Sequence, residues 1–216
     1  PLISQEGKGA SEISRKDETW ISDSGLITIA GGKLTGYRKM AETVVNLVAK
    51  QFRDEGYKLY SSCSTDKMPI SGGHVGGSSQ FEKYIAKHAD KGLQAGLSKE
   101  EAVAMLRKYG SNAPVMFELA QAYKEEAKLS GLPLDLFVAL RYSIEQEMVV
   151  TPLDFFNRRT GKLLFDIASV YKWKDAVIEE MAKVLHWSDK EKASYTKELE
   201  EEMKKATIPM PAEMNK

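Results

Sequence analysis

The sequence predicts a mainly α-helical protein in which a helical bundle domain follows a β-hairpin and a single helix. Three observations predict this fold class. Apolar residues recur at helical spacing in the segments after residue 79. Two short apolar runs between residues 19 and 30 flank a glycine-containing turn, as in a hairpin. A stretch rich in Gly and Ser separates these two regions and is typical of a linker.

The predicted hairpin consists of strands at 19–21 and 26–30, joined by a tight turn at 22–25 whose Gly25 can take a positive φ. The second strand is almost continuously apolar, which is expected of a strand covered on both faces. Gly31 and Gly32 then interrupt the strand pattern.

A helix is predicted from about residue 35 to 52. Its apolar residues follow a period of 3.6, at Tyr37, Met40, Ala41, Val44, Leu47, Val48 and Phe52. Without further strands beside it, this hairpin and helix would expose apolar side chains such as those of Leu26, Ile27, Val44 and Val48.

We divide the chain into residues 1–58, a linker at 59–79 and a helical domain at 80–216. Helices are predicted after the linker at about 79–90, 99–109, 114–128, 133–148, 152–158, 162–171, 174–186 and 189–206. Ser98 with Glu101, and Ser188 with Glu191, form capping-box patterns at two helix starts. The helix that carries Phe137, Leu140 and Ile144 is the most apolar, so we expect it at the centre of the bundle, whereas the last helix is polar and should face solvent.

Composition excludes several classes of function. Lys+Arg and Asp+Glu both number 31, so the chain has no net charge to attract nucleic acid or an anionic membrane. Cys63 is the single cysteine, so an internal disulfide cannot form, and we expect a reducing, cytoplasmic compartment. No apolar run approaches the ~20 residues of a membrane-spanning helix. The chain starts with Pro1, from which we expect it to be a piece of a longer protein.

The most informative segment for function is the run from Ile29 to Lys39. A strand ends, Gly31 and Gly32 turn the backbone, and a helix begins at once. The start of a helix leaves N–H groups without partners and carries partial positive charge, and Lys33 adds a full charge. This chemistry suits a phosphate, a carboxylate or the pyrimidine edge of a flavin. Spacing alone leaves open that the two glycines are a plain connector.

Residues 31–42, GGKLTGYRKMAE, closely resemble a signature of the aerobic, FAD-dependent glycerol-3-phosphate dehydrogenase family. Gly36 stands where many members have a second Thr, which removes one hydroxyl. Residues 14–17, 63–73, 147–156 and 158–160 also resemble segments of this family, so the resemblance covers essentially the whole chain.

The resemblance implies a flavoprotein oxidoreductase of glycerol metabolism, which oxidises sn-glycerol 3-phosphate to dihydroxyacetone phosphate and passes electrons through FAD to a quinone. It implies that residues 1–58 are the C-terminal end of an α/β flavin-binding domain, of which the hairpin and helix are a remnant. Gly32, Lys33, Leu34 and Thr35 would bind the cofactor, and Arg15 and Lys33 the substrate.

Other parts of the family's active site are missing from these 216 residues. The GxGxxG fingerprint that binds the FAD pyrophosphate is absent, and the family's catalytic His would lie upstream. We therefore expect no catalytic residue and no metal site in this chain, no activity and no retained FAD in isolation, and an upstream flavin domain as its partner.

Two alternatives stay open. The helical part could be a non-catalytic interaction or dimerisation module, so a homodimer is one option, or the parent could be a glycerol-3-phosphate oxidase that uses oxygen. The family reaches the cytoplasmic membrane peripherally, although no segment here marks a membrane-binding helix. We expect surface or packing roles for His74, His88, His186, Trp173 and Trp187, and structural salt bridges within the bundle for Arg158 and Arg159.

Overall fold

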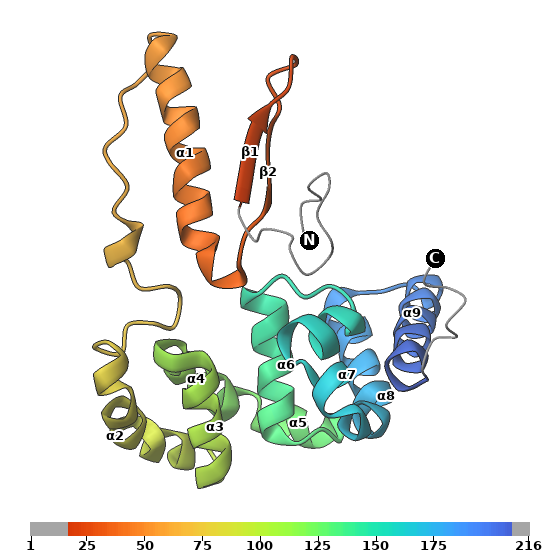
Figure 1. The fold of residues 1–216 in the computed structure, drawn as a ribbon. Helices are drawn as coiled ribbons and strands as arrows, with labels where there is room; N and C mark the ends of the chain where they lie inside the picture. The colour runs from red at the N-terminus through yellow and green to blue at the C-terminus, as the bar shows by residue number, and fades with distance from the viewer. Residues whose placement is uncertain (1–16, 209–216) are drawn as a thin grey trace. The chain divides into compact units, whose positions relative to one another are not determined.

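The computed structural model describes residues 17–208 of the chain (Figure 1). The chain divides into two compact units, Pro1–Pro69 and Ile70–Lys216. The boundary lies inside the segment 59–79. Helices dominate the described residues, and a two-stranded antiparallel sheet precedes them, so the predicted fold class is confirmed.

The described part of the first unit begins with the hairpin, formed by β1 (Asp17–Ile21) and β2 (Ile27–Gly31). The strands are antiparallel, with Asp17 opposite Gly31 and Ile21 opposite Ile27. The predicted turn closes through a hydrogen bond from Ser22 N to Leu26 O of 3.0 Å, and Gly25 has a φ of +82°. The predicted hairpin and its glycine are therefore confirmed.

After the hairpin, the 3₁₀ helix η1 (Leu34–Gly36) leads into α1 (Tyr37–Asp54). The chain then reverses and follows α1 back (Figure 1). The Phe52 ring lies 5.8 Å from the Tyr57 ring and 6.1 Å from the Tyr60 ring. Arg38 Nη1 donates to Thr65 Oγ1 at 3.3 Å, just where η2 (Thr65–Lys67) begins.

The first unit has no buried residue among residues 17–69. Leu26 is exposed, as predicted, whereas Ile27, Val44 and Val48 are half-buried. A sheet of two strands and one helix cannot enclose an apolar side chain on all sides, so residues 17–69 form no core of their own.

The second unit is helical throughout its described residues. Its elements are η3 (Ser78–Gln80), α2 (Phe81–Gln94), α3 (Lys99–Tyr109), η4 (Gly110–Asn112), α4 (Ala113–Ala122), α5 (Lys124–Ser130), α6 (Leu134–Gln146), the π-helix η5 (Asp154–Arg159), α7 (Lys162–Phe165), α8 (Ile167–Leu185) and α9 (Asp189–Thr207). Both predicted capping boxes are present, at Ser98 and at Ser188.

Two predicted helix boundaries are wrong. The helix predicted at 114–128 is broken at Tyr123, because the Tyr123 ring packs edge-on against Phe137, at 6.1 Å, and beneath the guanidinium of Arg141, at 4.4 Å. The helices predicted at 162–171 and 174–186 are instead a short α7 and one long α8. Asp166 caps α8 by accepting from Ser169 N at 3.3 Å.

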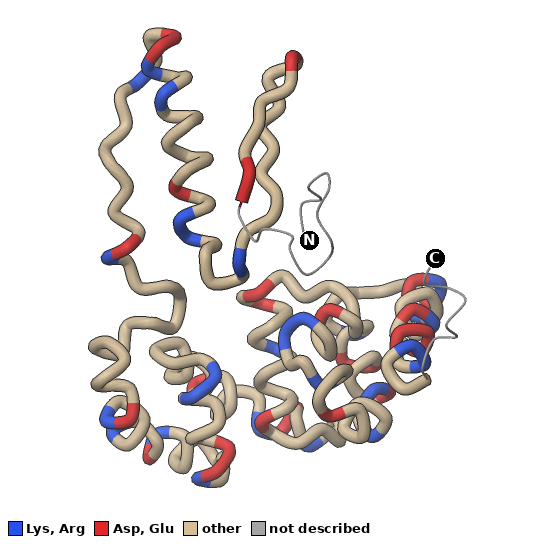
Figure 2. The backbone as a smooth tube through the Cα atoms, in the orientation of Figure 1, with Lys and Arg blue, Asp and Glu red and all other residues tan. Residues whose placement is uncertain are grey.

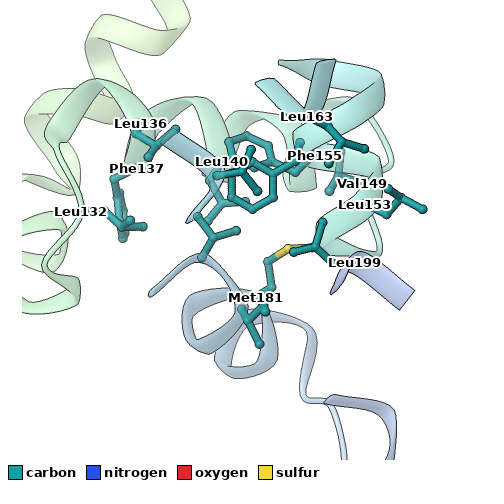
Figure 3. Packing of buried hydrophobic residues seen from close by; sticks show 14 of the residues in the cluster. Leu132, Leu136, Phe137, Leu140, Val149, Leu153, Phe155, Leu163, Met181 and Leu199 are labelled. Carbon is teal, nitrogen blue, oxygen red and sulfur yellow. The ribbon is translucent and has the colours of Figure 1, made fainter. Parts of the chain in front are cut away.

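Two buried clusters form the core of the second unit, and α6 contributes to both. Phe137 and Leu140 belong to the cluster shown in Figure 3, together with side chains from η5, α8 and α9. Val138 and Tyr142 belong to the cluster formed with α2, α3 and α4. The predicted central position of this helix is confirmed, with Phe137 and Leu140 fully buried and Ile144 half-buried.

The last helix, α9, presents mixed acidic and basic residues along its length (Figure 2). Its Leu199 and Met203 are buried, so one narrow stripe packs on the core while the rest faces solvent, as predicted. Trp173 and Trp187 pack against the same core, which confirms their packing role.

The Gly-rich residues at the start of the second unit pack against η4. Ser111 N donates to Gly72 O at 2.9 Å, Asn112 Nδ2 donates to Ser71 Oγ at 2.8 Å, and His74 N donates to Ser111 Oγ at 3.2 Å. The glycine in this contact permits a close approach of two backbone segments.

Candidate functional site

The candidate site is the turn between β2 and α1. Gly31 and Gly32 have φ values of +84° and +82°, a region that L-residues with a side chain rarely occupy. Lys33 returns to an extended conformation, with φ of −94° and ψ of 146°, and η1 begins after it. Two successive left-handed glycines therefore reverse the chain within two residues.

The turn presents free backbone donors. No side chain caps η1, and Gly36 N donates to Lys33 O at 2.8 Å. The N–H groups at the start of a helix have no partner inside it, so those of Leu34 and Thr35 remain available to an external acceptor. The helix begins as a 3₁₀ turn before α1, whereas the sequence predicts that α1 itself starts near Thr35.

Gly32 packs closely against Met40 and Asp17. A Cβ at this position would lie 2.6 Å from Met40 Sδ and 3.4 Å from Asp17 Cβ. Met40 sits one turn into α1 and supports the glycine from the side of the helix. Sequence reasoning assigned Met40 only to the apolar face of the helix, because its spacing of eight residues from Gly32 gives no sign of this contact.

Lys33 is exposed, and within residues 17–208 no carboxylate lies within 4.0 Å of its ammonium. The two other cations at the start of α1 are engaged, since Arg38 and Lys39 both bind Glu42, at 3.0 Å and 2.7 Å. The hydrogen bond from Lys39, supported by that from Arg38, holds the pKa of Glu42 below its usual value. Among the described residues, Lys33 is thus the cation at this turn that has no carboxylate partner.

The structure brings four predicted cofactor-binding residues together in one turn, namely Gly32, Lys33, Leu34 and Thr35. The Leu34 side chain is 92% exposed and has no packing role within the described part of the unit. The predicted substrate-binding residue Arg15 lies outside the described residues.

Several other polar residues have structural partners. His88 Nδ1 lies 2.7 Å from Tyr84 O, and its ring stacks on the Tyr84 ring at 4.1 Å, which confirms a packing role. Arg158 binds Asp154 within η5 at 2.6 Å, and Arg159 Nε lies 3.8 Å from Glu147 Oε2 at the end of α6, so both arginines form structural ion pairs.

Groups of three or more His, Cys, Asp or Glu side chains placed to hold a metal ion are absent from residues 17–208. Over the same residues, no helix combines the length and the apolar character needed to cross a membrane.

Known proteins resemble this chain closely. It is 49% identical to the aerobic glycerol-3-phosphate dehydrogenase of Bacillus subtilis strain 168, over 97% of this chain and 38% of the relative. It is 48% identical to that of Staphylococcus haemolyticus, over 96% of this chain and 37% of the relative. A solved structure, the glycerol-3-phosphate dehydrogenase from Bacillus halodurans complexed with FAD, is 42% identical with a TM-score of 0.82, over 90% of this chain and 39% of that chain.

The chain therefore spans well under half the length of these relatives. A family model described as the C-terminal domain of alpha-glycerophosphate oxidase matches residues 63–192, which is more than half of the chain. By this match, and by its likeness to relatives named aerobic glycerol-3-phosphate dehydrogenase, the chain belongs to the glycerol-3-phosphate oxidase and dehydrogenase family, as a C-terminal part.

Proposed function

We propose that this chain is part of an FAD-dependent glycerol-3-phosphate dehydrogenase, which oxidises sn-glycerol 3-phosphate to dihydroxyacetone phosphate and passes the electrons to a quinone. In this reaction the substrate loses a hydride from C2 and a proton from the C2 hydroxyl. FAD, when bound, accepts the two electrons. Relatives that are 48–49% identical are named aerobic glycerol-3-phosphate dehydrogenase, and a similar solved structure is complexed with FAD, which supports the dehydrogenase part of the proposal.

The observation that carries the proposal is the set of donors at the turn between β2 and α1. Within residues 17–208, the N–H groups of Leu34 and Thr35 and the Lys33 ammonium lie on one exposed turn without acceptors of their own. Such a turn fits the electron-rich pyrimidine edge of a flavin, where negative charge grows during reduction. Gly32 and Thr35 would hold this edge through their backbone, while Lys33, with Arg15, would also bind the substrate phosphate.

The first unit supports the proposal that an upstream flavin domain is its partner. None of its residues 17–69 is buried, and the exposed apolar side chains include Trp20, Leu26 and Val45. An apolar surface of this kind is stabilised when another domain covers it. Additional strands beside the hairpin would complete the sheet of an α/β domain.

Lys33→Met in the full-length flavoprotein tests the site. The substitution keeps most of the aliphatic stem and removes the charge, so the rate of flavin reduction should fall by about 10²–10³-fold. Flavin bleaching by glycerol 3-phosphate in single-turnover experiments measures this rate, and the flavin reduction potential should fall as well.

Lys50→Met is the matched control. Lys50 is also exposed on α1, but it lies far along the helix from the turn, so this variant should reduce at the rate of the unchanged protein. If Lys33→Met also remains within a few-fold of that rate, Lys33 is not part of the site and the glycines are a plain connector.

The electron acceptor is tested separately. The relatives are named dehydrogenases, whereas the matching family model is described by an oxidase. A quinone acceptor predicts substrate-dependent quinone reduction without hydrogen peroxide. Oxygen uptake with stoichiometric peroxide at a comparable rate would assign the protein to the oxidases instead.

A further inference from the structure

Gly32 lies between two residues whose backbone is held by the elements beside the turn. Gly31 is the last residue of β2 and pairs with Asp17 in the hairpin. Lys33 is the N-cap of η1, and its carbonyl accepts from Gly36 N at 2.8 Å. A glycine can adopt more backbone conformations than any other residue. Contacts from outside the turn therefore have to select its φ of +82°.

The Met40 side chain supplies such a contact. A Cβ added to Gly32 would lie 2.6 Å from Met40 Sδ and 3.1 Å from Met40 Cε. The end of this side chain, which is half-buried, thus fills the space where a side chain of residue 32 would lie. An unbranched thioether adapts well to an irregular gap of this kind. The turn therefore rests on α1 through one side chain.

The first turns of α1 are braced on both sides of Met40. Glu42 accepts from Lys39 at 2.7 Å and from Arg38 at 3.0 Å, and Arg38 also donates to Thr65 Oγ1 at 3.3 Å. The Glu42 side chain is only 17% exposed, so water screens these ion pairs less than it screens fully exposed ones. Met40 therefore extends toward the turn from a backbone that other contacts hold in place.

The donors of the turn follow Gly32 directly. Lys33, Leu34 and Thr35 are the next three residues, and all are exposed. The directions of their N–H groups depend on the φ and ψ of Gly32, because these angles set the course of the chain after it. Donors that already point toward a growing charge stabilise it better than donors that must first reorient.

We propose that Met40 is a positioning residue for the proposed flavin site. Its thioether fixes Gly32 and thereby directs the N–H groups of Leu34 and Thr35 toward the pyrimidine edge of the flavin. Met40 acts through Gly32 and has no catalytic role of its own. This inference rests on the proposed function, which identifies the flavin as the acceptor of these N–H groups.

Met40→Ala in the full-length flavoprotein tests the proposal. The substitution removes the thioether and retains the helix, since alanine is the best helix former. Once Gly32 is free to move, the donors should stabilise the negative charge of reduced flavin less well. The preference for reduced over oxidised FAD should fall about tenfold, which lowers the two-electron reduction potential by about 30 mV. Redox titration against a reference dye measures this potential without turnover.

Two further variants separate positioning from stability. Val44 lies one helical turn after Met40 on the same face of α1 and is also half-buried. The three atoms that would lie nearest a Cβ on Gly32 belong to Met40 and Asp17, not to Val44. Val44→Ala should therefore lower the thermal stability but leave the potential unchanged. Met40→Leu keeps a similar apolar volume and should retain the potential of the unchanged protein.

Three results would overturn the proposal: an unchanged potential in Met40→Ala, an equal shift in Val44→Ala, or an equal shift in Met40→Leu. If Met40→Ala loses its flavin, the FAD dissociation constants of the three variants are compared instead. Weaker binding confined to Met40→Ala supports the proposal, and equal weakening in Val44→Ala contradicts it.

The proposed function is tested independently of Met40. Flavin bleaching by glycerol 3-phosphate in the unchanged full-length protein reports on the reaction, whereas the redox titration needs no substrate. A protein that bleaches with this substrate, but whose Met40→Ala variant keeps the original potential, would retain the proposed function and lose the positioning role. Absence of bleaching would reject the proposed reaction whatever the potentials are.

Discussion

At Gly72 and Gly110, two segments of the backbone approach closely because neither residue has a Cβ. A Cβ on Gly110 would lie 2.1 Å from Gly72 O, and a Cβ on Gly72 would lie 2.6 Å from Tyr109 O. Both glycines also have a positive φ, of +53° for Gly110 and +82° for Gly72. The contact anchors the start of the second unit against the end of α3.

Gly110→Ala should destabilise the second unit by about 3 kcal/mol or more, because backbone strain and a clash with an immovable carbonyl act together. Gly131→Ala separates the two effects. Gly131 has a φ of +73°, but a Cβ added to it would meet no atom within 4 Å, so only strain of about 1 kcal/mol is expected there. Urea denaturation of both variants measures the difference, and equal losses would show that the close approach is not important.

At the scale of elements, α2 and α3 pack unusually closely at Gly92. A Cβ there would lie 2.4 Å from Ala102 Cβ and 3.1 Å from Phe117 Cε1. Gly92 is in the last turn of α2 and is buried. The two helices therefore meet through a glycine and an alanine, which allows their backbones to approach.

Gly92→Ala should lower the stability of the second unit, although alanine is usually favoured over glycine inside a helix. Alanine is favoured over glycine by about 1 kcal/mol in an exposed helix, but overpacking here should give a net loss of about 1–3 kcal/mol. Adding Ala102→Gly frees the space again, so the double variant should recover part of the loss. Thermal unfolding of the single and double variants tests this, and a Gly92→Ala variant as stable as the original chain would contradict the packing.

At the scale of the whole molecule, the two units differ in how their apolar side chains are enclosed. The second unit buries two hydrophobic clusters, whereas residues 17–69 bury none. The second unit can thus be stabilised by its own core. The first unit carries the candidate flavin-binding turn on elements that expose much of their apolar surface.

The chain alone should retain no FAD after purification. It offers one wall of the proposed site, the turn at Gly32 and Lys33, while the sequence contains no GxGxxG turn to bind a pyrophosphate. Visible absorbance of freshly purified protein measures bound flavin, with the full-length flavoprotein as the positive control. Stoichiometric flavin on the 216-residue chain would contradict the proposed dependence on an upstream domain.

Local patterns were sufficient for much of the fold. The turn at Gly25, the capping boxes at Ser98 and Ser188, and the central position of α6 all follow from signals within a few residues of each other. The sequence also points to the turn at Lys33, since a strand, two glycines and a helix start are adjacent in the chain. Short-range hydrogen bonding and helical periodicity determine such features, so they are readable without tertiary structure.

What the sequence by itself determined is therefore the class of fold, the order of its elements and the turn that carries the proposed flavin contact. Only the tertiary structure decided the break at Tyr123, the support of Gly32 by Met40, and the close approach of Gly72 and Gly110. Each of these features depends on contacts between residues that are not neighbours in the sequence. The spacing of apolar residues predicts which face of a helix is buried, but the packing of the whole unit decides which residues contact that face.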